Sequence, residues 1–267
     1  MDLRAKFGFT QVPFTREIRV AERFRLPLYD EAVDALFCVV DRRMSAALIA
    51  PAGTGKTALL RALTARLPEA RYKVHYVKAN ALSRKDLCRE IATAMGIAPA
   101  GNLPSLLRRL QDRFLEVTDT DGLRPVLILD DAHELRRDVL GIIRVITNFE
   151  MDSRLVLSVI LAGQAGLGNN LQRPDLEDVT RRLAHCATLR PLSRDETLKY
   201  AEHRCSVAGA RSFPFDNAAV DTLYELGRGN LRATDALALK ALEIALTAKS
   251  QVVDHNHVVE SRKQLWP

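Results

Sequence analysis

The chain has 267 residues, of which 47% are hydrophobic and 27% charged, so a disordered chain is excluded and one main domain with a smaller second one is expected. Its formal net charge of +6 favours a polyanionic partner. The N-terminus lacks an apolar signal segment and no apolar run is long enough to span a bilayer, which predicts a cytoplasmic protein with no membrane partner.

The first 27 residues are predicted to form a basic N-terminal arm or a packed lead-in to the next domain. Pro13 and Pro27 cannot continue a helix, so no long helix is expected in this segment. Cations outnumber acidic residues here, and they are Arg4, Lys6, Arg16, Arg19, Arg23 and Arg25.

Helices and strands are predicted to alternate over residues 28–191. Helical spacing of apolar residues indicates helices at about 28–43, 56–67, 84–95, 106–117 and 138–149. Short apolar runs indicate strands at 45–50, 73–78, 125–129, 155–162 and 185–189. This alternation is typical of an α/β domain with a parallel sheet flanked by helices.

No strand pattern persists after about residue 192. Ser193 and Glu196 form a capping box that begins one helix, and Asp216, Asn230 and Asp254 can each cap another. Residues 192–267 are therefore predicted to form a smaller helical domain.

The segment from Ala50 to Thr57 has the pattern of a phosphate-binding P-loop. It follows a predicted strand and begins a helix, where free backbone N–H groups and the helix dipole favour an anion. Lys56 can reach the β- and γ-phosphates of ATP, and the Thr57 hydroxyl can ligate Mg²⁺, although Ala50 replaces the usual first glycine. The predicted nucleotide-binding residues are Pro51, Ala52, Gly53, Thr54, Gly55, Lys56, Thr57 and Ala58.

Two adjacent carboxylates, Asp130 and Asp131, follow the apolar strand at 125–129. The first is predicted to hold Mg²⁺ through a water molecule, with Thr57 as the other metal-binding residue, and the second to orient or deprotonate the water that attacks the γ-phosphate. Many related enzymes place Glu at the second position, so the shorter Asp131 predicts slower hydrolysis, or hydrolysis that requires a partner or an oligomer to tighten the geometry. The alternative for Asp131 is that its side chain caps the following helix.

These motifs resemble those of AAA+ ATPases of the ExeA group and its TniB- and TnsC-like relatives, over nearly the whole chain. The resemblance rests on residues 7–14 (Phe-Gly-Phe-Thr-Gln-Val-Pro-Phe), on residues 50–57, and on residues 127–133 (Leu-Ile-Leu-Asp-Asp-Ala-His). It implies an AAA+ fold with a C-terminal helical lid, and rings or filaments with ATP at the subunit interfaces.

The resemblance also implies roles for four residues beyond the P-loop. Gln164 would be a sensor near the γ-phosphate, or a plain strand-end turn. Arg182, or else Arg181, would be an arginine finger that acts on a neighbouring subunit's ATP, the alternative being an ordinary surface pair. Arg232, in the segment Gly-Asn-Leu-Arg, would reach over the phosphates from the lid.

Three functions fit this sequence. The first is a regulator of transposition that assembles with ATP on duplex DNA and recruits a transposase. The second is an ExeA-like ATPase of a secretion system. Proteins with that role continue into a membrane span, whereas this sequence ends at Pro267. The third is a signalling NTPase. Candidate DNA contacts, each alternatively part of a solvated helix face, are Arg84, Lys85, Arg89, Arg108, Arg109, Arg113 and the arginines of the arm.

Overall fold

The computed structural model describes residues 2–265, so Met1, Trp266 and Pro267, which the predicted domain boundaries include, lie outside the described residues. Contacts divide the chain into two compact units. The α/β unit comprises Pro27–Pro51 and Lys56–Leu189. The helical unit comprises the chain up to Leu26, the short segment Ala52–Gly55, and the chain from Arg190 onward.

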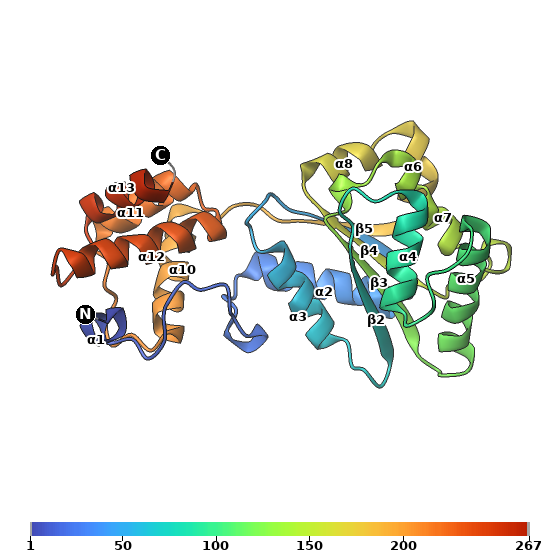
Figure 1. Cartoon of the computed structure of the whole chain (residues 1–267), viewed down its shortest axis with the longest axis horizontal. Coiled ribbons are helices and arrows are strands. Elements are labelled where there is room, and N and C mark those ends of the chain that lie inside the picture. The colour runs from blue at the N-terminus through green and yellow to red at the C-terminus, as the bar shows by residue number, and fades with distance from the viewer. Residues whose placement is uncertain (1, 266–267) are drawn as a thin grey trace. The chain divides into compact units, whose positions relative to one another are not determined.

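Five parallel strands form the sheet of the α/β unit, in the order β2-β3-β4-β1-β5 (Figure 1). The strands are β1 Ser45–Ile49, β2 Tyr72–Lys78, β3 Arg124–Asp130, β4 Ser158–Gly163 and β5 Leu183–Thr188. Because all strands run the same way, their carboxyl ends share one edge of the sheet and their amino ends share the other. The predicted fold class, a parallel sheet flanked by helices, is confirmed.

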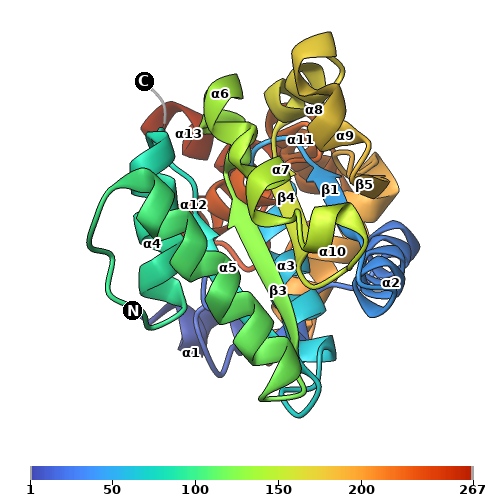
Figure 2. The same ribbon diagram turned by 90° about the vertical axis from the view of Figure 1, so that its right-hand side faces the viewer.

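Helices cover both faces of this sheet. They are α2 Pro27–Asp41, α3 Lys56–Arg66, α4 Arg84–Ala94, α5 Leu103–Asp119, α6 Arg137–Leu140, α7 Ile142–Ile146, α8 Ala165–Leu171 and α9 Glu177–Thr180. Helices α4 and α5 lie side by side against β2 and β3 (Figure 2), whereas α2 packs on α3, β1 and β5. Leu127 and Leu129 of β3 share a core cluster with α4 and α5, and the alternation along a strand turns Ile128 to the opposite face.

Two sequence predictions in this unit were wrong in detail. The helix predicted at 138–149 is two short helices that break at Gly141, a poor helix former, and the second ends at Ile146. The strand predicted at 155–162 begins only at Ser158, which pairs with Val126. The preceding residue on β3 is Pro125, which has no N–H to donate to a ladder.

The helical unit contains α10 Arg194–Val207, α11 Asn217–Gly227, α12 Leu231–Thr247 and α13 His255–Leu265. The predicted caps are present. Ser193 and Glu196 form a capping box, and Asp216 and Asn230 accept hydrogen bonds from backbone N–H groups in the first turns of α11 and α12. Asp254 accepts one from the N–H of His257 at the start of α13.

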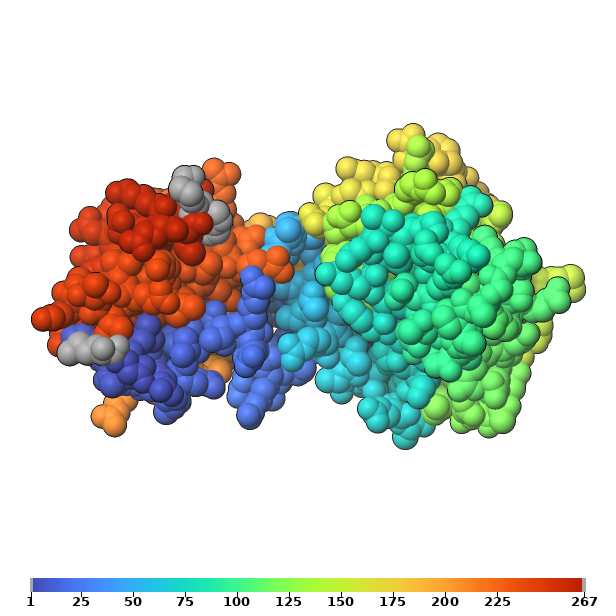
Figure 3. Space-filling model, viewed as in Figure 1, coloured from blue at the N-terminus to red at the C-terminus, as the bar shows by residue number. Residues whose placement is uncertain are grey.

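The N-terminal segment, which includes α1 Leu3–Phe7, packs on these helices (Figure 3). Phe7, Phe9 and Phe14 are buried in the core cluster of the helical unit, and the Phe14 ring meets the Phe215 ring edge to face with centroids 6.0 Å apart. Buried Arg204 donates to the carbonyl of Thr15. Aromatic side chains therefore fix a segment whose charges are conspicuous in the sequence.

Residues 2–265 contain no helix that combines the length and the apolarity needed to cross a bilayer. Within the same residues, no group of three or more His, Cys, Asp or Glu side chains is arranged to hold a metal ion. All four cysteines are free thiols; Cys88 and Cys205 are buried, and Cys38 and Cys186 are exposed.

Candidate functional site

The loop at residues 50–55 joins the carboxyl end of β1 to the first turn of α3. Its start is tied to the sheet, because the N–H of Ala50 donates to the carbonyl of Gly163 at the end of β4, at 2.9 Å. Gly53 and Gly55 have φ angles of 75° and 92°, which residues with a Cβ rarely adopt. The loop thus has the backbone that lets N–H groups before a helix approach a phosphate.

Lys56, the first residue of α3, is paired with both carboxylates that follow β3. Its Nζ lies 2.5 Å from Asp131 Oδ1 and 3.0 Å from Asp130 Oδ1. The Lys56 side chain is 11% exposed and that of Asp130 only 3%, whereas that of Asp131 is 27% exposed, so the cluster is buried at Asp130 and more open at Asp131. An entering phosphate would compete with the carboxylates for the ammonium group.

Thr57 and Asp130 are brought together in a way that suits a magnesium ion. Thr57 Oγ1 donates to Asp130 Oδ2 at 3.3 Å. Mg²⁺ prefers oxygen atoms of these two kinds as ligands. The structure therefore brings together the two oxygen atoms that would hold the ion, directly or through water.

Strand β2 contributes two residues to this cluster that sequence reasoning missed. Tyr76 donates its hydroxyl to Asp130 Oδ2 at 3.0 Å, and Lys78 Nζ lies 3.8 Å from Asp131 Oδ2. Burial raises the pKa of Tyr76, and the neighbouring Asp130 raises it further, so the phenol stays a donor. The pairing of β2 with β3, which sets Lys78 opposite Asp130, is the signal that would have revealed both.

Asp131 stands in a left-handed backbone conformation, with φ of 56°. Burial raises its pKa, but the hydrogen bond and charge of Lys56, followed by the charge of Lys78, lower it by more, so the pKa lies below its ordinary value. The group is therefore a carboxylate at neutral pH. Its side chain caps nothing in the 3₁₀ turn Ala132–Glu134 that follows, which removes the support for the capping alternative.

Gln164 lies at the end of β4, at the same edge of the sheet, and contacts a residue of the Asp130 segment. Its Nε2 is 2.6 Å from Nε2 of His133. The other ring nitrogen of His133, Nδ1, is buried and has no partner among the described residues. This contact links the ends of β3 and β4, which is more than a strand-end turn requires.

Arg181 and Arg182 precede β5 and so lie at the opposite, amino edge of the sheet. The five residues of β1 alone separate the two edges by roughly 17 Å, at about 3.3 Å per residue. Arg182 is bound through both Nη atoms to the carboxylate of Asp152, and Arg181 pairs with Glu177 at 2.7 Å. Neither arginine joins the cluster around Lys56.

Arg232 is the second residue of α12 in the helical unit, which also includes the loop segment Ala52–Gly55. The backbone N–H of Arg232 donates to the carbonyl of Gly53 at 3.2 Å. The side chain of Asn230, the helix cap, donates to the carbonyl of Ala52 at 2.5 Å, a contact that sequence reasoning missed. The contact of Arg232 with the loop is thus made by its backbone.

Comparison with known proteins agrees with this geometry. Residues 40–171 match the family model of the AAA domain. The chain is 28% identical over 255 residues to the general secretion pathway protein A of Aeromonas hydrophila. That match covers 94% of this chain but 46% of the relative, so the chain spans less than half of the relative's length.

Solved structures share the fold. The Cdc6p structure from Pyrobaculum aerophilum matches with a TM-score of 0.75 at 19% identity, over 94% of this chain and 70% of that one. The Aeropyrum pernix ORC1 protein, solved in complex with DNA, matches with a TM-score of 0.68 at 22% identity, over 91% and 67%. The RuvB Holliday junction branch migration motor of Thermotoga maritima matches with a TM-score of 0.60 at 16% identity, over 89% and 68%.

Proposed function

We propose that this chain binds ATP with Mg²⁺ and hydrolyses the nucleotide, as the match of residues 40–171 to the family model of the AAA domain suggests. The observation that carries this proposal is the cluster at the carboxyl edge of the sheet. Lys56, Thr57, Asp130 and Asp131 meet there within hydrogen-bonding distance, beside a loop with two left-handed glycines.

Each residue of the cluster has a distinct task in this proposal. Backbone N–H groups of residues 51–55 and the start of α3 bind the phosphates, and Lys56 turns from the carboxylates to the β- and γ-phosphates. Thr57 and Asp130 would hold Mg²⁺, which would neutralise charge on the phosphate oxygens. Tyr76 fixes the carboxylate of Asp130 through its hydroxyl.

Hydrolysis is assigned to Asp131, which accepts a proton from, or orients, the attacking water. Its lowered pKa supports this role because only the carboxylate can accept a proton. Gln164 contacts the γ-phosphate, and its hydrogen bond to His133 connects it to the segment that follows Asp130. For Arg232 we propose the role that the resemblance implies, a contact of its side chain with the phosphates. Since Asp is one methylene shorter than Glu, we expect slow turnover by the isolated chain.

Arg182, with Arg181 as the alternative, acts in trans in this proposal. Both lie at the edge of the sheet opposite the P-loop, so a second copy in a ring or filament is needed to bring either to a γ-phosphate. Such a homo-oligomer would hold ATP at its subunit interfaces.

For the cellular role we propose a DNA-associated regulator of transposition, which assembles with ATP on duplex DNA and recruits a transposase. The net charge of +6 supports a polyanionic partner, and the structurally similar ORC1 protein was solved with DNA. The predicted basic groups are partly engaged: Arg84 pairs with Asp138, Arg89 with Asp86, and Arg113 with Glu116. Exposed pairs of this kind are weak enough to exchange for DNA phosphates.

A second role is supported equally well by the comparison with the secretion protein of Aeromonas hydrophila, namely an ATPase that serves a secretion or envelope assembly system. The two roles use the same ATP site and differ in the partner that stimulates it. A signalling NTPase would be stimulated by neither DNA nor cell-wall material.

Phosphate release tests the activity and separates the roles. We expect Mg²⁺-dependent release from ATP that rises with duplex DNA and falls as salt is raised, with filaments or rings visible by electron microscopy. Stimulation by peptidoglycan or membrane vesicles, with no effect of DNA, would favour the secretion role. Wild-type protein that releases no phosphate under any of these conditions would contradict the proposed hydrolysis.

A further inference from the structure

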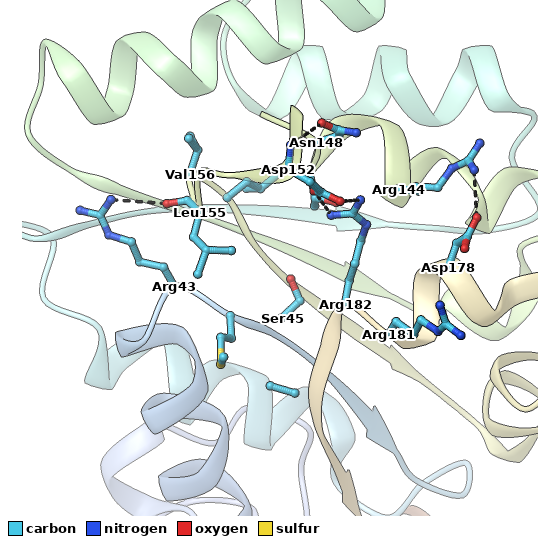
Figure 4. A pocket seen from close by; sticks show the side chains of 14 residues that line it. Arg43, Ser45, Arg144, Asn148, Asp152, Leu155, Val156, Asp178, Arg181 and Arg182 are labelled. Carbon is cyan, nitrogen blue, oxygen red and sulfur yellow. Dashed lines mark hydrogen bonds and ion pairs between the residues drawn. The ribbon is translucent and has the colours of Figure 1, made fainter. Parts of the chain in front are cut away.

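A cavity of about 700 Å³ opens at the amino edge of the sheet of the α/β unit, away from the P-loop (Figure 4). Residues before and at the start of β1, the segment before β4, and the residues leading into β5 form its wall. The charged side chains in the lining are four arginines and two aspartates, which gives it an excess of positive charge: Arg43, Arg144, Arg181, Arg182, Asp152 and Asp178.

Arg182 is held more firmly than the other arginines of this cavity. Its Nη1 and Nη2 donate to the two oxygens of Asp152 at 2.6 and 2.5 Å, and the side chain is 20% exposed (Figure 4). These hydrogen bonds lower the pKa of Asp152. Arg144, by contrast, shares a single hydrogen bond of 2.9 Å with Asp178, and both of these side chains are more than half exposed.

The loop that presents Asp152 has an unfavourable backbone. Glu150, Met151 and Asp152 follow one another with φ angles of 49°, 56° and 70°, a conformation that is costly for residues with a Cβ. The loop is held by hydrogen bonds from the N–H of Asp152 to the Asn148 side chain and from the Ser153 hydroxyl to the carbonyl of Glu150. These contacts hold the carboxylate of Asp152 toward Arg182.

We propose that Asp152 is a positioning residue that withholds Arg182, and that Arg182 is released when the triphosphate of a second copy of this chain reaches the cavity. The inference rests on the proposed function, in which Arg182 acts on a neighbour's ATP. It adds that the finger is occupied in the free protomer and that Asp152 raises the protein concentration at which assembly activates hydrolysis.

The geometry makes the two anions mutually exclusive. A carboxylate bound to both Nη atoms occupies the edge of the guanidinium whose N–H groups would donate to two phosphate oxygens. A nucleotide triphosphate carries more negative charge than one carboxylate, so it can displace Asp152 once a neighbour delivers it. The adjacent Met151 is 96% exposed and gives that neighbour an apolar contact beside the cavity.

The test is the ATPase rate per protomer as a function of protein concentration. Asp152→Asn should lower the concentration that gives half of the maximal rate by about two- to fivefold, the range for loss of an exposed ion pair, while the maximal rate changes little. Arg182→Ala should abolish the assembly-dependent rate, and the double variant should behave like Arg182→Ala.

Asp178→Asn is the matched control, because it removes an arginine's partner from the same cavity and leaves Arg182 alone; its concentration dependence should stay as in wild type. A lower maximal rate in Asp152→Asn would mean that Asp152 orients the finger for catalysis, and an unchanged concentration dependence would mean a plain surface pair. Either result overturns the inference.

The proposed function can fail separately in the same experiment. Full wild-type activity in Arg182→Ala would refute the finger role of Arg182 and, with it, the role of Asp152. Binding of a fluorescent ATP analogue and melting temperatures, measured for every variant, identify one that no longer binds ATP or no longer folds. Asp152→Glu, which keeps the charge, should keep the half-maximal protein concentration near that of wild type if charge pairing holds Arg182.

Discussion

Thr57 Oγ1 and Asp130 Oδ2 lie 3.3 Å apart, one on the first turn of α3 and the other at the end of β3. The parallel sheet and the P-loop bring together two residues that are 73 positions apart in the chain. Both offer oxygen atoms of the kind that Mg²⁺ binds. Several measurable consequences depend on this pair and on the carboxylate beside it.

Thr57→Ala should raise the Mg²⁺ concentration needed for half-maximal hydrolysis by about tenfold, the effect of losing roughly 1.4 kcal/mol of binding free energy. Thr57→Ser keeps the hydroxyl and should remain near wild type. A magnesium titration of phosphate release measures both. Equal magnesium dependence of Thr57→Ala and wild type would remove Thr57 from the metal site.

Asp131→Asn should keep ATP binding and reduce kcat by about 10²- to 10⁴-fold, the usual contribution of a general base. Asp131→Glu should hydrolyse at least as fast as wild type, because the longer side chain reaches the position that the related enzymes use. Single-turnover phosphate release gives both rates. A normal kcat in Asp131→Asn would assign the base to another residue.

Phe14→Ala should destabilise the helical unit by about 3–5 kcal/mol, since this buried ring packs on Phe215. Val12→Ala is the control, because Val12 is 44% exposed and its truncation should cost little. Urea denaturation gives the free energies of unfolding. Equal stability of the two variants would show that the N-terminal segment contributes nothing to this core.

Asp235 predicts a pH dependence of stability in the helical unit. Burial raises its pKa from 3.8 to about 6, against the opposing charge of Arg204. The folded state therefore binds this proton more tightly than the unfolded state. The associated stability is fully present below about pH 4 and is lost as the pH rises through 6, by about 3 kcal/mol for a shift of two units.

The measurement is the difference in unfolding free energy between wild type and Asp235→Asn from pH 4 to 7. In this difference, the contributions of the other titrating groups to the pH dependence cancel. Wild type should lose stability relative to the variant as the pH rises. A flat or rising difference would mean that the pair with Arg204 outweighs burial.

Sequence patterns predicted most helices and strands, and the P-loop and carboxylate residues of the candidate site, because those features depend on residues close together in the chain. The caps at Ser193 and Asn230 and the loop glycines depend on near neighbours in the chain. Tyr76 and Lys78 were missed because their contacts with Asp130 and Asp131 follow from strand order, which periodicity does not encode. The same limit hid the partner of Arg182.

The helix predicted at 138–149 shows a different limit. One long helix and two short helices that bury the same side have the same spacing of apolar residues. The break at Gly141 is therefore not visible in the apolar pattern. The left-handed run at residues 150–152 contains no glycine, which is the usual signal for that conformation.

The most direct test of the central claim is the equilibrium binding of Mg·ATP to wild type and to Lys56→Ala, measured by calorimetry or with a fluorescent analogue. Wild type should bind, and Lys56→Ala should lose about 100-fold or more in affinity, because a charge-assisted contact to phosphate is removed from a partly buried site. Lys78→Ala, which removes a more distant cation from the same carboxylates, should keep most of the affinity. Wild-type affinity in Lys56→Ala would contradict the proposal that this loop binds ATP.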